Sequence, residues 1–175
     1  MTAWTDQWIS AAERSVLVGD RSLDANELTD TCRHYLRAAE YYRLALRGAN
    51  QGSPERRAWR EAQADLFRAT APLLPHPSTM VDGSILPAYG YLFRPLGRPG
   101  PWSAAIVTPS ASSVTVESLY EATAVPILEL GMACGIFGWV DDAEPGQVDG
   151  REAPLVEWVA AQPGIDPDRI CLAPG

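Results

Sequence analysis

The chain has 175 residues, with 22 acidic and 14 basic side chains, a formal net charge of −8 and 46% hydrophobic residues. This length suits one domain, or a compact domain with a helical appendage, and it is long enough to bury a sizeable core. Because the neutralisation of phosphates needs clustered basic side chains, the acidic balance argues against a nucleic-acid partner.

The chain shows no sign of membrane insertion or export. No apolar run approaches the roughly 18 residues that a membrane-spanning helix needs. The first residues, "MTAWTDQWIS", lack the basic and apolar regions of a signal peptide. All fourteen basic residues are Arg, which we interpret as the codon bias of a GC-rich bacterial genome. We therefore expect a cytoplasmic protein with no membrane partner.

The first seventy residues carry helical patterns. A helix is predicted over residues 5–18, closed near Gly19. Asp24 and Glu27 have the spacing of a capping box, and the amphipathic run that follows predicts a long helix ending at Gly48. The expected inner face of this helix comprises Leu28, Cys32, Tyr35, Leu36, Ala39, Tyr42 and Leu46.

A third helix is predicted to begin after Ser53, with Ser53 as N-cap and Pro54 at the first helical position. Its expected inner face comprises Trp59, Ala62, Leu66 and Ala69. From Pro72 onward Pro and Gly become frequent and apolar residues fall into short runs, so we place a boundary near residue 74.

Strands dominate the second part of the pattern. Two strands at about 79–86 and 88–94, joined around Pro87, predict a hairpin. From residue 102 the runs "WSAAIVTPS", "SSVTVESLYEATAVPILELG", "ACGIFGWV" and "EAPLVEWVAAQ" alternate between strand and helix. A short buried strand from Arg169 to Ala173, preceded by an Asp-Pro turn, closes the series. The order β-α-β-α-β predicts an α/β fold with a mostly parallel sheet.

Cysteines and glycine-rich loops give no metal or cofactor signal. Cys32, Cys134 and Cys171 lie far apart without a C-x-x-C pair, so we expect three buried thiols and neither a disulfide framework nor a zinc site. Neither G-x-G-x-x-G nor G-x-x-x-x-G-K-[ST] occurs. We therefore expect no cofactor.

These segments, in this order, resemble the α/β-hydrolase superfamily. They resemble most closely its bacterial branch with an N-terminal helical cap, which includes C–C bond hydrolases, esterases and acyl-peptidase-like proteins. The matching stretches are "RHYLRAAEYYRLA" for the cap helix, "DGSILPAYGYLFRP" for the first hairpin, "AAIVTPSASSVTVESLY" for the strand and loop before helix A, "DDAEPGQ" for the turn often written D-G-P-G-Q, and "VEWVAAQPGIDPDRICLAPG" for the approach to the nucleophile elbow. The resemblance implies a helical cap over residues 1–74 and a partial hydrolase-like core over residues 75–175.

The catalytic triad of that family has no counterpart in the pattern. A hydrolase of this fold carries its nucleophile on a strained turn written G-x-S-x-G, which orients the hydroxyl toward a base and supplies an oxyanion amide. No such pattern occurs, and Gly175 matches at most its first glycine. The sequence therefore predicts a chain truncated before the nucleophile elbow and lacking the Ser-His-Asp triad.

Two loops supply candidate site residues. The resemblance places Ser110 and Ser112 of "PSASSV" where the fold provides the other oxyanion-hole amide. The alternative is that Ser112, Ser113 and Thr115 cap the following helix. The acidic residues Asp141, Asp142 and Glu144 follow a strand at the edge where doubly wound sheets bind ligands. They could act as acid and base or seat a divalent cation, or they could form a solvated turn.

The two histidines are weaker candidates. His34 lies mid-helix beside Arg33, where a surface or partly buried packing role competes with that of a general base. His76 lies between prolines in a predicted loop. Neither has a Ser or Cys at an identifiable spacing, so only the fold can bring them a partner.

Three functions remain open at this point. The first, which we favour, is an altered enzyme that binds a small organic, biosynthetic substrate between cap and strand ends and performs non-covalent hydrolase, lyase or cyclase/isomerase chemistry. The second is a non-catalytic pseudoenzyme or subunit whose strand Arg169 to Ala173 pairs with a second copy or a separate chain, as a homodimer or heteromer. The third is a fragment of an ordinary hydrolase.

Overall fold

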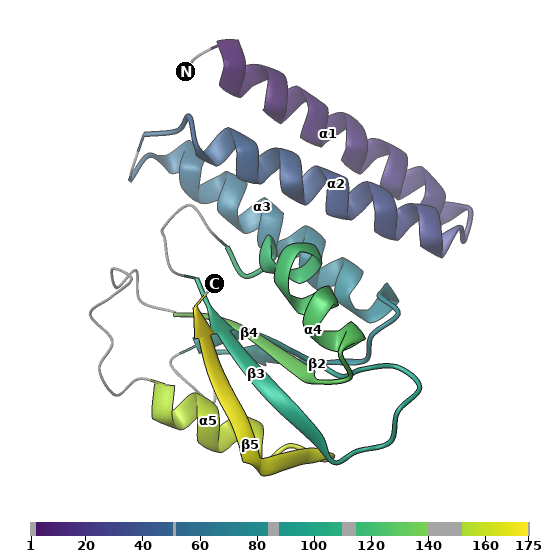
Figure 1. Ribbon diagram of the computed structural model, residues 1–175. Helices are drawn as coiled ribbons and strands as arrows, with labels where there is room; N and C mark the ends of the chain where they lie inside the picture. Colours follow the sequence, from purple (N-terminus) through teal and green to yellow (C-terminus); the bar gives the residue numbers. More distant parts are fainter. Residues whose placement is uncertain (1–2, 51, 84–87, 110–114, 140–151, 175) are drawn as a thin grey trace. The chain divides into compact units, whose positions relative to one another are not determined.

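A computed structural model of the chain describes residues 3–50, 52–83, 88–109, 115–139 and 152–174 (Figure 1). The chain divides into two compact units, Met1–Leu74 and Pro75–Gly175. The first is helical, and the second is built on a mixed sheet (Figure 1). The predicted fold class, a helical segment followed by an antiparallel hairpin and a βαβαβ run, is confirmed.

The first unit consists of helices α1 (Ala3–Asp24), α2 (Leu28–Leu46) and α3 (Pro54–Thr70), followed by a 3₁₀ turn over Ala71–Leu73. Helix α2 packs against both α1 and α3. Among the described helices, none combines the length and the apolar character that crossing a membrane requires.

The turn between α1 and α2 differs from the predicted capping box. Asn26 adopts the left-handed conformation, with φ of 59°. The Glu27 N–H donates to the Ser22 carbonyl at 2.8 Å, and the Asn26 N–H donates to the Leu23 carbonyl at 2.9 Å. These two bonds form a Schellman motif that ends α1. The side chain of Glu27 makes no cap bond, so the capping-box prediction is wrong. The Glu27 N–H, which a capping box would need, already donates to the end of α1.

The other two helix signals have different outcomes. Helix α1 continues through Gly19, so the predicted end there is wrong. The N-cap at Ser53 is confirmed, because the Arg56 N–H donates to the Ser53 hydroxyl at 3.2 Å and Pro54 is the first helical residue. The fully buried residues of α3 are Gln63, Phe67 and Thr70, so the buried face is rotated from the predicted one.

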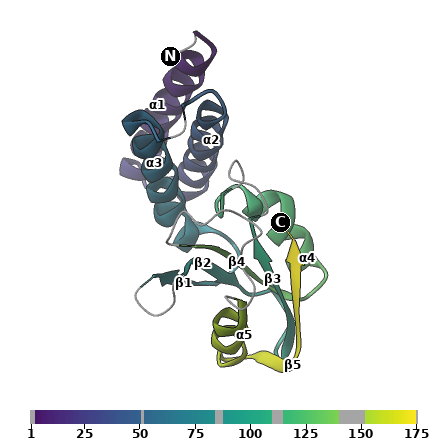
Figure 2. The same ribbon diagram turned by 90° about the vertical axis from the view of Figure 1, so that its left-hand side faces the viewer.

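The second unit contains one five-stranded sheet within the described residues, in the order β1-β2-β4-β3-β5 (Figure 2). The strands are β1 (Ser78–Asp82), β2 (Ala88–Phe93), β3 (Trp102–Thr108), β4 (Ala133–Trp139) and β5 (Ile165–Pro174). Strands β1, β2 and β4 are antiparallel neighbours, whereas β4, β3 and β5 are parallel. The hairpin is confirmed; the residues around Pro87 that join it lie outside the described part.

The helical connection between β3 and β4 is irregular because of Pro126. A π-helical turn over Tyr120–Ala124 leads into the short helix α4 (Val125–Glu129). Proline has no N–H and its ring clashes with the carbonyl four residues earlier in an α-helix. The π turn places Pro126 at the start of a new helix, where the missing N–H costs nothing. The predicted single helix is therefore divided.

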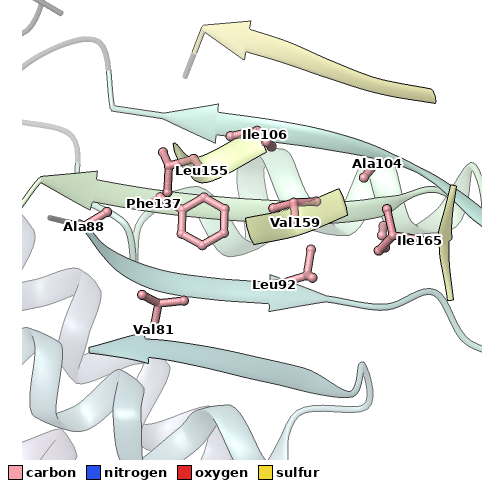
Figure 3. Packing of buried hydrophobic residues seen from close by; sticks show 10 residues of the cluster. Val81, Ala88, Leu92, Ala104, Ile106, Phe137, Leu155, Val159 and Ile165 are labelled. Carbon is pink, nitrogen blue, oxygen red and sulfur yellow. The ribbon is translucent and has the colours of Figure 1, made fainter. Parts of the chain in front are cut away.

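The main core of this unit lies between the sheet and α5 (Glu152–Ala160), as Figure 3 shows. Phe137 of β4 is fully buried, and its ring meets Trp158 of α5 edge-on at 5.9 Å between centroids. The cluster comprises Val81, Ala88, Leu92, Ala104, Ile106, Ala133, Phe137, Leu155, Val159 and Ile165. Alternation along the strands turns Phe93 to the opposite face, against Tyr120.

The prediction of a short buried strand at Arg169 to Ala173 is wrong in length and in burial. Strand β5 is longer than predicted and lies at one edge of the described sheet, where Leu172 is 51% exposed. Cys171 is also exposed and Cys32 is half-buried, so only Cys134 is buried as predicted, and burial raises its pKa to about 12. The predicted Asp-Pro turn is an Asx turn within the strand, where the Asp168 N–H donates to Asp166 Oδ1 at 3.1 Å.

Candidate functional site

The carboxyl ends of the three parallel strands share one edge of the sheet. Strands β3, β4 and β5 end at Thr108, Trp139 and Pro174, and their parallel register brings these ends together. Ligands of open α/β sheets bind outside this edge. The candidates Ser110 and Ser112 follow β3, and Asp141, Asp142 and Glu144 follow β4; all five lie outside the described residues.

The first described residue after the β3 loop is Thr115, which forms a reciprocal cap with Ser118. The Ser118 N–H donates to Thr115 Oγ1 at 3.3 Å, and the Thr115 N–H donates to Ser118 Oγ at 3.1 Å. This is the geometry of a capping box, with serine in place of the usual Glu. The bonds close a turn ahead of the π-helical segment, whose N-cap is Leu119, so the capping of that helix by Thr115 stays a prediction. The pair fixes the direction in which the chain enters the helical connection.

His34 has a packing environment within the helical unit. It is half-buried on α2, and its main-chain carbonyl accepts a hydrogen bond of 2.9 Å from the Ser15 hydroxyl of α1. Its Cβ lies against α1 near Gly19. These contacts join α1 to α2. A catalytic role for the ring stays a prediction.

A pair that the sequence pattern does not reveal joins His76 to Tyr120. The Tyr120 hydroxyl and His76 Nδ1 share a hydrogen bond of 3.1 Å across 44 residues of sequence. Tyr120 is 3% exposed, and its ring packs on Phe93 at 4.9 Å. Phe93 is the register partner of Cys134 at the beginning of β4, so the pair lies over the amino-terminal half of that strand. The pair is therefore separate from the edge of the sheet at which the carboxyl ends of β3, β4 and β5 lie.

Electrostatics at this pair favour the neutral imidazole. Desolvation lowers the pKa of His76 below its ordinary 6.5, and the Glu129 carboxylate opposes this with a smaller effect. The neutral ring can accept a hydrogen bond from the Tyr120 hydroxyl or donate one to it, so a proton is shared between a buried phenol and a half-buried imidazole. The only sequence signal for it is the two residue types, because the contact depends on the fold.

The lowered pKa predicts a pH dependence of stability. As the pH falls, the unfolded chain protonates His76 near pH 6.5, before the folded protein does. The contribution of His76 to the free energy of unfolding is therefore complete above pH 6.5. It declines as the pH falls from 6.5 toward the lower pKa of His76 in the folded protein. We expect the wild-type midpoint of urea unfolding to drop further between pH 7.5 and 5 than that of His76→Asn. Parallel curves for the two proteins would contradict this expectation.

A helical unit followed along the chain by an antiparallel hairpin and three parallel strands is the element order of an α/β-hydrolase-like fold. The solved structure of the 2,6-dihydroxy-pseudo-oxynicotine hydrolase matches it with a TM-score of 0.77 at 22% identity, over 99% of this chain and 50% of that chain. The solved structure of AbyA5 matches with a TM-score of 0.59 at 16% identity, over 98% of this chain and 45% of that chain. These likenesses establish the fold.

Sequence comparison finds curated relatives that are longer than this chain. A curated relative, the hydrolyase poxO of Penicillium oxalicum, is 29% identical over 144 residues, which cover 77% of this chain and 34% of that protein. The same protein from Penicillium oxalicum strain 114-2 / CGMCC 5302 matches equally. No family model matches the chain. The chain thus spans about a third of the curated relatives' length and half or less of that of the two solved structures.

Proposed function

We propose that the chain forms the cap, Met1–Leu74, and a core portion, Pro75–Gly175, of an α/β-hydrolase-like enzyme that acts on a small organic substrate. The chemistry is that of a non-covalent hydrolase, a lyase or a cyclase/isomerase. The observation that carries the proposal is the shared edge of β3, β4 and β5 in a fold that matches a hydrolase structure with a TM-score of 0.77.

The residue types at this edge suit such chemistry. Ser110 and Ser112, with the main-chain N–H groups around them, would bind a substrate oxygen, and the carboxylates Asp141, Asp142 and Glu144 would take up or return a proton. The 175 residues contain no G-x-S-x-G sequence, and the proposal therefore assigns no acyl-serine role to any of them. The names of the similar proteins, a hydrolase and a hydrolyase, fit the same reaction classes.

A second candidate function is that of a non-catalytic subunit that pairs through β5. One specific observation favours it: β5 is an edge strand of the described sheet, and both Cys171 and Leu172 are exposed on it. An exposed edge presents unpaired main-chain groups, and proteins usually cover such edges. In this case Arg169 to Ala173 would pair with the same strand of a second copy or with a strand of another chain.

Native mass spectrometry of the 175-residue protein after incubation with a fluorophosphonate tests both candidates. We expect the unmodified mass, because a fluorophosphonate labels activated serines and the proposed site has none. A serine hydrolase in the same mixture serves as the positive control. Stoichiometric labelling of this chain would contradict the non-covalent proposal. A dimer that Leu172→Asp converts to a monomer would favour the second candidate, whereas an unlabelled monomer would count against it.

A further inference from the structure

The three helices of the first unit form a groove of about 310 Å³. Val16 of α1, Tyr35 and Tyr42 of α2, and Leu66 of α3 contribute to its lining. The two Tyr residues are only 7% and 9% exposed, so their rings form its floor. Small-molecule sites begin at volumes of about 300 Å³ and are lined mostly by apolar and aromatic groups with a few polar ones. The groove therefore has the size and lining of a small-molecule site.

The wall that α3 contributes is an apolar stripe left partly open. Ala62, Leu66 and Ala69 have the spacing of a buried helix face, but the fully buried residues of α3 lie one position further along. Ala62 and Leu66 are half-buried and Ala69 is exposed. Covering apolar surface is worth about 25 cal/mol per Å². A ligand with an apolar body would gain this free energy here.

A glycine in α1 positions the polar group of the groove. A Cβ at Gly19 would lie 2.6 Å from the Tyr35 ring, so only glycine lets the ring lie this close to α1. Glycine inside a helix is less favourable than alanine, so this position trades helix stability for the close approach of the ring. The close approach brings the Tyr35 hydroxyl to Asp20 Oδ1, to which it donates at 2.7 Å. Burial and the Asp20 carboxylate raise the pKa of Tyr35 to about 12, so the hydroxyl stays a neutral donor.

Both charged residues that line the groove are carboxylates. Asp65 is already paired with Arg68 at 2.7 Å on the surface of α3. Asp20 is exposed on α1, and the hydrogen bond that it receives comes from the neutral Tyr35, which does not offset its negative charge. No basic side chain belongs to the lining within the described residues. The charge complementary to this groove is therefore positive.

We propose that the groove is a binding site for a small organic amine. The ammonium donates to the Asp20 carboxylate, and the apolar body of the ligand covers Leu66 and the α3 stripe. The Tyr35 and Tyr42 rings add a cation–π contribution, which aromatic floors provide to ammonium groups. This site lies within the helical unit and does not depend on the reaction proposed for the carboxyl edge of the sheet.

The test compares three probes of one shape on the full 175-residue protein by isothermal calorimetry. The probes are the cationic 3-phenylpropan-1-amine, the neutral 3-phenylpropan-1-ol and the anionic 3-phenylpropionate. We expect the amine to bind up to about fivefold more tightly than the alcohol, because Asp20 is exposed and an exposed ion pair contributes at most about 1 kcal/mol. The carboxylate probe should bind most weakly, because it meets a like charge.

Variants assign the effect to the groove. Asp20→Asn keeps an acceptor for Tyr35 and should abolish the preference for the amine, whereas Asp30→Asn, a surface carboxylate paired with Arg33, should leave it unchanged. Ala69→Phe, at an exposed position, fills the groove and should weaken all three probes. Circular dichroism confirms the fold of each variant. Equal affinities for the three probes, an unchanged preference in Asp20→Asn, or no amine binding at millimolar concentration would overturn the proposal.

Discussion

Gly90→Ala should lower the free energy of unfolding by about 3 kcal/mol or more. Gly90 of β2 lies opposite Phe137 of β4, and a Cβ there would be 2.0 Å from the Ile136 carbonyl oxygen and 2.8 Å from the Phe137 Cα. Both atoms belong to the backbone of a central strand. They cannot yield without separating β2 from β4. Urea unfolding followed by circular dichroism measures the loss.

Gly97→Ala is the matched control for this prediction. Gly97 has φ of 70°, but nothing lies within 4 Å of the Cβ position, so the change adds conformational strain without a clash. A left-handed conformation costs a non-glycine residue about 1–2 kcal/mol. We therefore expect the smaller loss at Gly97. Equal losses would show that strain, and not close strand approach, sets the cost at Gly90.

The order of elements could be predicted because the hydrophobic period changes from helical to strand-like along the chain. The ends of the helices were harder to predict, because several local hydrogen bonds compete at each end. At the α1–α2 turn Asn26 takes the left-handed conformation and satisfies α1 first, which removes the capping role of Glu27. Before Pro126 the spacing of apolar residues predicts a regular helix, although the chain forms a π turn there. This spacing does not reveal a local widening of the helix.

Some of the candidate sites could likewise be predicted from the sequence, and others could not. The edge beyond β3 and β4 could be predicted, since consecutive parallel strands place their carboxyl ends together. The His76–Tyr120 pair could not, because 44 residues separate its members and no spacing rule joins them. The open stripe of α3 could not be predicted either, because the sequence pattern of an apolar helix face indicates burial. The packing of α1 and α3 on α2 leaves this stripe partly uncovered.

Phe137→Ala should cost about 3–5 kcal/mol of unfolding free energy, the range found for buried aromatic residues. Phe137 is fully buried in the centre of the sheet, beneath Leu155, Val159 and Trp158 of α5. Removing the ring takes away its contacts with α5 and leaves a cavity that the backbones of β2 and β4 cannot close. Urea unfolding measures the change, and a loss below about 1 kcal/mol would contradict this description of the core.

Leu172→Ala is the control on the same face of the sheet. Leu172 is the register partner of Ile106, a member of the Phe137 cluster, but it lies on the edge strand and is 51% exposed. The monomer should therefore lose only about 0.5 kcal/mol. A loss close to that of Phe137→Ala would mean that the β5 edge is covered in the folded protein in solution. The ratio of the two losses thus separates a free edge from one paired with another strand.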